Sequence, residues 1–174
     1  MSDPSLDDLD RRVRDDIERH GWHVVKVVAD EDAPAWAYTI GLGQTQQHPE
    51  LAIFGMELDA MHAFLNHLGA LVCAGRRFES GQEYEGIFEG MRCAFRAVAP
   101  RWLDVFFGNA AWHYRSAEVP ILQCLWPDES GLLPWEPGFD ESWREVQPLL
   151  HEAELERALA PRLAAVLRRE GALA

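Results

Sequence analysis

The stretch AWAYTIGLGQTQQHPELAIF, residues 35–54, contains two apolar segments separated by a polar one. Across residues 35–42 large side chains alternate with alanine, threonine and glycine, a period of two that is typical of a β-strand with one bulky and one small face. The small face would let a helix or another backbone approach closely. Residues 51–54 are apolar and bounded by proline and glycine, so we predict a buried strand there. Residues 43–49 are expected to form a polar loop between the two strands.

The remaining sequence predicts an α+β fold around these two strands. Apolar residues recur every three or four positions in two segments that we predict to be amphipathic helices. Helices are expected over residues 1–20, 58–75 and 149–174, one or two short helices over 102–114, and further strands over 22–28, 83–88, 91–98 and 121–126. We therefore expect a single domain spanning residues 1–174, in which a mostly antiparallel or mixed sheet of about five to six strands is packed by two or three helices. Its first and last helices are expected to flank that sheet.

The composition excludes several classes of protein. The chain has 174 residues, 48% of them hydrophobic, and its 16 basic and 29 acidic side chains give a formal charge of −13. Such an acidic, apolar-rich chain is expected to be globular and to bind neither nucleic acid nor an anionic membrane surface. No run of about 18 apolar residues and no secretion signal is present, and the three cysteines are widely spaced. A cytoplasmic location follows as the expectation.

Short motifs for metal or cofactor chemistry are absent from the sequence. There is no pair of cysteines two apart, no His-Glu-x-x-His, no Gly-x-Ser-x-Gly and no phosphate-binding glycine motif. We therefore expect no cofactor and no metal. A metal site assembled from distant residues, such as His23, His48, His113 and Asp128, stays open as an alternative.

Three groups of residues carry a resemblance to a known family. They are Tyr38-Thr39-Ile40-Gly41-Leu42, His48-Pro49-Glu50-Leu51, and Leu122-Gln123 with Trp126-Pro127-Asp128 and Pro134-Trp135. In this order and spacing they resemble a bacterial family catalogued as a domain of unknown function, family 4262, over about residues 20–150. The resemblance implies no activity. The first group also resembles, more weakly, a segment of the suppressor-of-fused superfamily, whose bacterial members are proposed to be immunity proteins that bind toxins.

One functional hypothesis is a protein-binding or immunity-type module with an acidic surface. Complementary charge speeds association, so a basic protein partner would suit a chain of charge −13. Exposed aromatic side chains commonly anchor such interfaces, and Trp112 and Trp135 are the tryptophans that we expect to be the most exposed. The oligomeric state stays open.

The alternative hypothesis is a ligand-binding protein or an enzyme. The family-like groups lie at strand ends and loops, where sites are commonly built, so a pocket is expected near His48, Glu50 and Asp128. In that pocket His48 would transfer a proton, and Glu50 or Asp128 would orient the His48 side chain. The candidates for contacts with a ligand or partner are Tyr38, Thr39, Trp126 and Trp135. The competing interpretation of His48-Pro49-Glu50 is a turn at the boundary of a strand.

Overall fold

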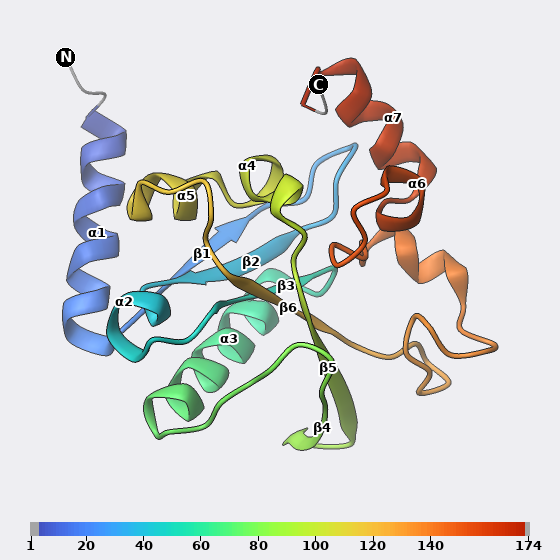
Figure 1. Ribbon diagram of the computed structural model, residues 1–174, viewed down its shortest axis with the longest axis horizontal. Coiled ribbons are helices and arrows are strands. Elements are labelled where there is room, and N and C mark those ends of the chain that lie inside the picture. Colours follow the sequence, from blue (N-terminus) through green and yellow to red (C-terminus); the bar gives the residue numbers. More distant parts are fainter. Residues whose placement is uncertain (1–3, 173–174) are drawn as a thin grey trace.

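Six strands form one mixed sheet in the computed structural model, which describes residues 4–172 (Figure 1). The strands are β1 (His23–Val27), β2 (Trp36–Ile40), β3 (Glu50–Phe54), β4 (Glu83–Phe88), β5 (Met91–Ala97) and β6 (Ile121–Leu125). Their spatial order is β1-β2-β3-β6-β5-β4, and every neighbouring pair is antiparallel except β3 and β6. The α+β class and the mostly antiparallel sheet are thus confirmed. The parallel contact brings the two halves of the chain together at the centre of the sheet.

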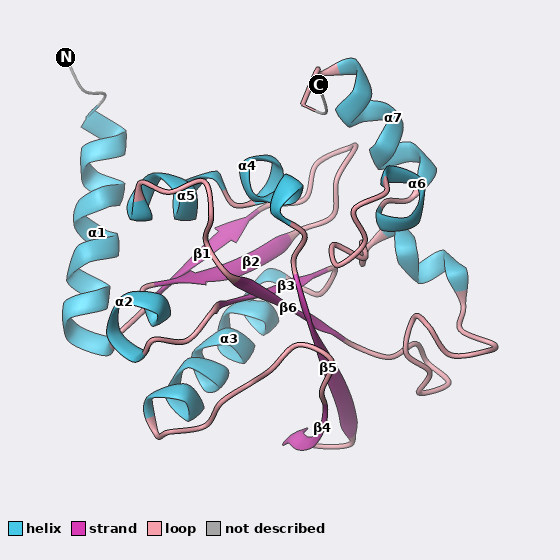
Figure 2. Cartoon of the chain, in the orientation of Figure 1, coloured by secondary structure: helices cyan, strands magenta, loops and turns pink. Residues whose placement is uncertain are grey.

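Helices cover both faces of this sheet (Figure 2). They are α1 (Pro4–His20), α2 (Leu42–Gln46), α3 (Leu58–Cys73), α4 (Leu103–Phe106), α5 (Gly108–Tyr114), α6 (Leu155–Ala158) and α7 (Pro161–Arg169), with 3₁₀ turns at Pro100–Trp102 and Glu141–Glu145. Across residues 4–172 none of the helices combines the length and apolar character that a bilayer crossing requires.

Two sequence predictions for the helices were wrong. The polar segment after β2 was expected to be a loop, yet it begins with α2, because Gly41 takes a left-handed conformation and turns the chain into a short helix. The C-terminal segment is two short helices, not one. Pro161 restricts the preceding residue to extended backbone, and Ala160 has φ −63° and ψ 151°, so α6 ends before α7 begins.

The alternating pattern of β2 separates two hydrophobic cores. Tyr38 and Ile40 point into a core with α1, α4, α5 and the C-terminal helices. The small residue Ala37 points to the other face, where it shares a core with Met61 and Leu65 of α3. The small face of β2 thus accommodates a helix, as the sequence pattern predicts.

Two buried glutamines attach the C-terminal segment to the sheet. The side chain of Gln123 in β6 donates to the carbonyl oxygen of Pro148 at 2.6 Å and accepts from the backbone N–H of Leu150 at 3.0 Å. Gln147 forms the reciprocal pair with the backbone of Trp126, at 2.8 Å and 3.0 Å. These four bonds satisfy backbone groups that would otherwise be buried without partners.

Candidate functional site

The Glu50 carboxylate lies at the start of β3, where only 1% of the residue is exposed. It accepts hydrogen bonds from three backbone N–H groups and two hydroxyl groups. Its Oε1 accepts from the N–H of Gly41 at 2.9 Å, from the N–H of Gly43 at 3.1 Å and from the Tyr114 hydroxyl. Its Oε2 accepts from the Thr39 hydroxyl at 2.6 Å and from the N–H of Leu42 at 3.4 Å. We call these five donors, with Glu50, the carboxylate cage. Four of its six residues, Thr39, Gly41, Leu42 and Glu50, belong to the groups that carry the resemblance described above.

The glycines of the cage allow the chain to close around the carboxylate. Gly41 has φ +118°, and a Cβ there would lie 2.7 Å from Ile17 of α1, so a larger residue would be both strained and crowded. A Cβ at Gly43 would lie 3.2 Å from the Tyr114 hydroxyl. Both positions therefore keep the backbone N–H groups close enough to reach the carboxylate.

The two hydroxyl donors connect the cage to its surroundings. Thr39 donates to Glu50 and accepts from the backbone N–H of Leu51 at 2.9 Å, so it links β2 to β3. Tyr114, the last residue of α5, donates to Glu50 and accepts from the N–H of Gly41 at 3.1 Å. The cage thus joins three segments that are separate in the sequence.

Burial determines the protonation behaviour of the cage. It raises the pKa of the Glu50 carboxyl above its usual value, and the hydrogen bonds from Thr39, Tyr114, Gly43 and Gly41 oppose that rise without cancelling it. Burial also raises the pKa of Tyr114, with a further contribution from the charge of Glu50. Tyr114 therefore remains a hydroxyl that can donate to the carboxylate.

His48 is next to the cage but takes no part in it. Its Nδ1 lies 2.7 Å from the carbonyl oxygen of Pro49, and its Nε2 lies 3.0 Å from the backbone nitrogen of Phe78. Because a backbone N–H can only donate, Nε2 is the acceptor and Nδ1 carries the proton. Burial lowers the pKa of His48, consistent with this neutral form. Both ring nitrogens are thus occupied by backbone groups, and Glu50 is not one of the partners of His48.

Asp128 lies at the other end of the sheet from Glu50. Its carboxylate accepts from the backbone N–H groups of Ser130, Leu132 and Asp140, at 2.8 to 3.0 Å, and orders the loop after β6. Glu50 pairs with Ile121, the first residue of β6. The strand β6 is about 13 Å long, and the loop that contains Asp128 follows its other end. The structure therefore does not bring Asp128 together with Glu50.

The remaining candidates lie outside the cage. Tyr38 is buried, its ring packs edge-on against Phe107 with 5.1 Å between centroids, and burial raises its pKa to about 12. The indole N–H of Trp126 donates to the carbonyl oxygen of Phe54 at 2.9 Å. Trp135 lies under the guanidinium of Arg96, 4.2 Å from ring centroid to Cζ. Only Thr39, among the residues expected to contact a ligand, belongs to the cage.

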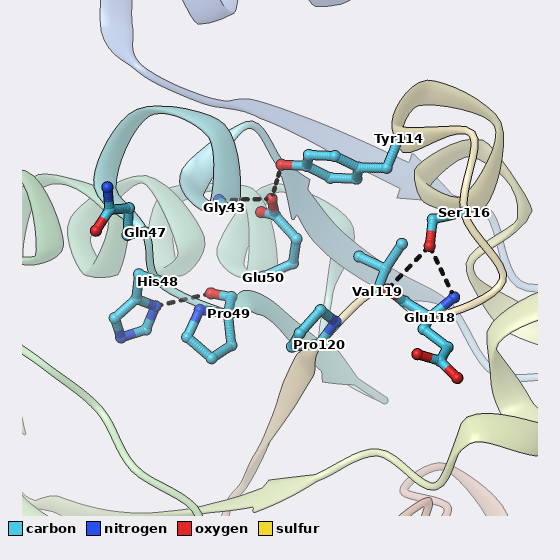
Figure 3. A pocket seen from close by; sticks show the side chains of 10 residues that line it. All are labelled: Gly43, Gln47, His48, Pro49, Glu50, Tyr114, Ser116, Glu118, Val119 and Pro120. Carbon is cyan, nitrogen blue, oxygen red and sulfur yellow. Dashed lines mark hydrogen bonds between the residues drawn. The ribbon is translucent and has the colours of Figure 1, made fainter.

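A pocket of about 520 Å³ adjoins the cage (Figure 3). It is lined by Gly43, Gln47, His48, Pro49, Glu50, Tyr114, Ser116, Glu118, Val119 and Pro120. Its lining contains two carboxylates and neither lysine nor arginine. We call it the Glu50 pocket. The sequence reasoning missed the wall formed by Tyr114 and residues 116–120, because nothing in the sequence relates that segment to residues 64 or more positions earlier.

A dispersed metal site is the other alternative that the sequence leaves open. Within residues 4–172, no group of three or more histidine, cysteine, aspartate or glutamate side chains is placed to hold a metal ion. His23 bonds to Asp16 at 2.6 Å and His113 bonds to Gln44 at 3.2 Å. The four residues considered from the sequence are therefore not assembled into one site.

Comparison with known proteins identifies a family. Residues 16–140 match the model of a family described as a domain of unknown function, DUF4262. No curated protein and no solved structure matches the chain. The matched range includes every residue of the carboxylate cage and ends before the segment attached by Gln147.

The raised pKa of Glu50 leads to a prediction for pH dependence. A carboxyl whose pKa is higher in the folded than in the unfolded protein contributes most to stability below the unfolded value, about 4.3, and loses that contribution as pH rises through its folded pKa. The free energy of unfolding of the wild type minus that of Glu50→Gln should therefore fall as pH increases from about 4. Urea unfolding at a series of pH values measures this difference.

The comparison variant for this experiment is Glu129→Gln, which removes an exposed carboxylate outside the pocket. The difference in the free energy of unfolding between the wild type and Glu129→Gln should not fall in this way as pH increases. If the free energy of unfolding of the wild type minus that of Glu50→Gln increased with pH, the hydrogen-bond donors would outweigh burial. That result would contradict the raised pKa of Glu50.

Proposed function

The chain belongs to the family of domains of unknown function DUF4262, and on that premise we propose that it binds a small organic cation in the Glu50 pocket. The observation that carries this proposal is that residues of the family-like groups line a cavity of about 520 Å³. Gly43, His48, Pro49 and Glu50 come from those motifs and their immediate neighbours. A volume of about 520 Å³ is within the range of pockets that hold small molecules.

The charge of the lining supports a cationic ligand. Across the described residues, Glu50 and Glu118 have no lysine, arginine or histidine nitrogen within 4.0 Å. A buried carboxylate without a counter-ion is costly even when hydrogen-bonded, and a bound ammonium or guanidinium would offset that cost. Val119, Pro120 and Pro49 offer apolar surface for the hydrocarbon part of such a ligand.

The hydrogen bonds favour binding over catalysis. The Glu50 oxygens already accept five bonds, and both nitrogens of His48 are occupied by backbone groups. General acid–base catalysis needs a group that can reach a proton of the substrate. These two side chains are better suited to holding the pocket in shape.

Native mass spectrometry and thermal shift test the proposal. Freshly purified protein should retain a small basic molecule, and benzylamine should raise Tm where benzyl alcohol, of the same shape without the charge, does not. Glu118→Gln should weaken benzylamine binding roughly fivefold, since an exposed carboxylate contributes up to about 1 kcal/mol. Glu129→Gln serves as the matched control with wild-type binding.

Two outcomes would contradict the proposal. One is equal binding of benzylamine and benzyl alcohol. The other is an unchanged affinity in Glu118→Gln, because the charge of the pocket would then play no part in recognition.

A second candidate function is docking of a basic protein on the β4–β5 hairpin. The strand β4 forms an edge of the sheet, and the exposed glutamates Glu85 and Glu89 lie on it or at its turn, whereas Glu83 pairs with Arg92 at 3.2 Å. Beside them a hollow of about 430 Å³ includes Phe88 and Met91 in its lining. Acidic groups around apolar surface suit a partner segment that contains both lysine or arginine and apolar residues.

A salt titration tests this second candidate. A lysine-rich peptide with a central leucine should bind more weakly as ionic strength increases, and the double variant Glu85→Gln/Glu89→Gln should bind less tightly with a shallower salt dependence. The double variant Glu18→Gln/Glu145→Gln removes two other exposed glutamates and is the control. Equal losses in the two double variants would indicate attraction to overall charge and would exclude a specific site on the hairpin.

A further inference from the structure

A further hollow lies between α1 and α5, and none of its lining residues lines the Glu50 pocket. It measures about 390 Å³ and is lined by Asp10, Arg14, Trp112, His113 and Arg115. Figure 1 shows α5 alongside α1. Trp112 is 72% exposed, although most tryptophans of the chain are buried or half-buried. The exposure of Trp112 confirms the expectation from the sequence, and we call this site the Trp112 hollow.

The charges around Trp112 differ from those of the chain as a whole. In a chain of net charge −13, two guanidinium groups, those of Arg14 and Arg115, line the same hollow. Within residues 4–172 neither of them has a carboxylate oxygen within 4.0 Å, whereas Arg11 pairs with Asp8 on the same helix as Arg14. One carboxylate, that of Asp10, lines the hollow as well, but it pairs with neither arginine, so the two guanidinium groups outnumber the one acid there.

The backbone holds this arrangement in place. Arg115 caps α5 in the left-handed conformation, with φ 50° and ψ 44°, which is unfavourable for a residue with a Cβ. The N–H of Ser116 bonds to the carbonyl oxygen of Ala111 at 3.2 Å and closes the end of the helix. His113 is anchored to Gln44 by a 3.2 Å contact. Trp112, His113 and Arg115 therefore project from a defined helix end, and Asp10 and Arg14 project from α1.

We propose that the Trp112 hollow binds a small planar aromatic anion. The ligand's ring would stack on the exposed indole of Trp112, since tryptophan favours offset stacking with other aromatic rings. Its carboxylate or phosphate would lie between Arg14 and Arg115, because guanidinium groups pair with such anions through charge-assisted hydrogen bonds. Neither half of this recognition involves Glu50 or Glu118, so the site is independent of the proposed cation pocket.

Three probes separate the contributions of ring and charge. They are 2-naphthoate, which has both, 2-naphthylmethylamine, which has the ring with the opposite charge, and inorganic phosphate, which has the charge alone. In ¹H–¹⁵N NMR spectra the indole signal of Trp112, assigned by its loss in Trp112→Phe, should shift on addition of 2-naphthoate. The other two probes should shift it far less at equal concentration.

Variants of the two arginines complete the test. Arg14→Gln and Arg115→Asn should each weaken 2-naphthoate binding roughly fivefold, asparagine being chosen because it tolerates the left-handed backbone. Arg19→Gln, an exposed arginine of α1 outside the hollow, should bind as the wild type does. Equal shifts with the naphthoate and the amine, a response to phosphate alone, or equal losses in Arg14→Gln and Arg19→Gln would each overturn the proposal.

Discussion

The structure depends on how the chain satisfies the buried carboxylate of Glu50. Removing an ionisable group from water costs several kcal/mol unless hydrogen bonds replace its hydration. Here five donors do so, three of them backbone N–H groups that converge because Gly41 and Gly43 allow the chain to turn closely around the oxygens. The turn after β2, the first turn of α2 and the position of Tyr114 all follow from that requirement. Replacing Thr39 or Tyr114 by a residue without a hydroxyl would remove a donor, and a larger residue at Gly41 would disturb the turn that presents the N–H groups.

The cage also explains where a pocket can form. Tyr114 ends α5 and bonds to Glu50, so the segment after it passes close to the start of β3. The N–H of Glu50 bonds to the carbonyl oxygen of Pro120 at 2.9 Å, which fixes the far end of the same segment. Between these two attachments, residues 116–120 stand as one wall and His48 with Pro49 as the other (Figure 3). The cage residues thus have a structural role first, and the binding proposal builds on the cavity that this role creates.

Local sequence patterns predicted the strands and the long helices well, because alternation and helical spacing are properties of neighbouring residues. The same patterns placed Thr39 on the small face of β2, but they could not show that it faces Glu50. The error over Asp128 has a topological cause. Strand order is not encoded locally, and the parallel pairing of β3 with β6 puts Glu50 and Asp128 at opposite ends of the sheet. Tyr114 was missed for the same reason, since it is 64 residues from its partner.

The most direct test of this account is a double-mutant cycle between Glu50 and Tyr114. Urea unfolding of the wild type, Glu50→Gln, Tyr114→Phe and the double variant gives the coupling free energy of the pair. A hydroxyl that donates to a buried carboxylate should give a coupling of about 1 to 3 kcal/mol, and the double variant should be less destabilised than the sum of the single ones. A coupling near zero would contradict the account, because Tyr114 would then not stabilise the carboxylate on which the cage depends.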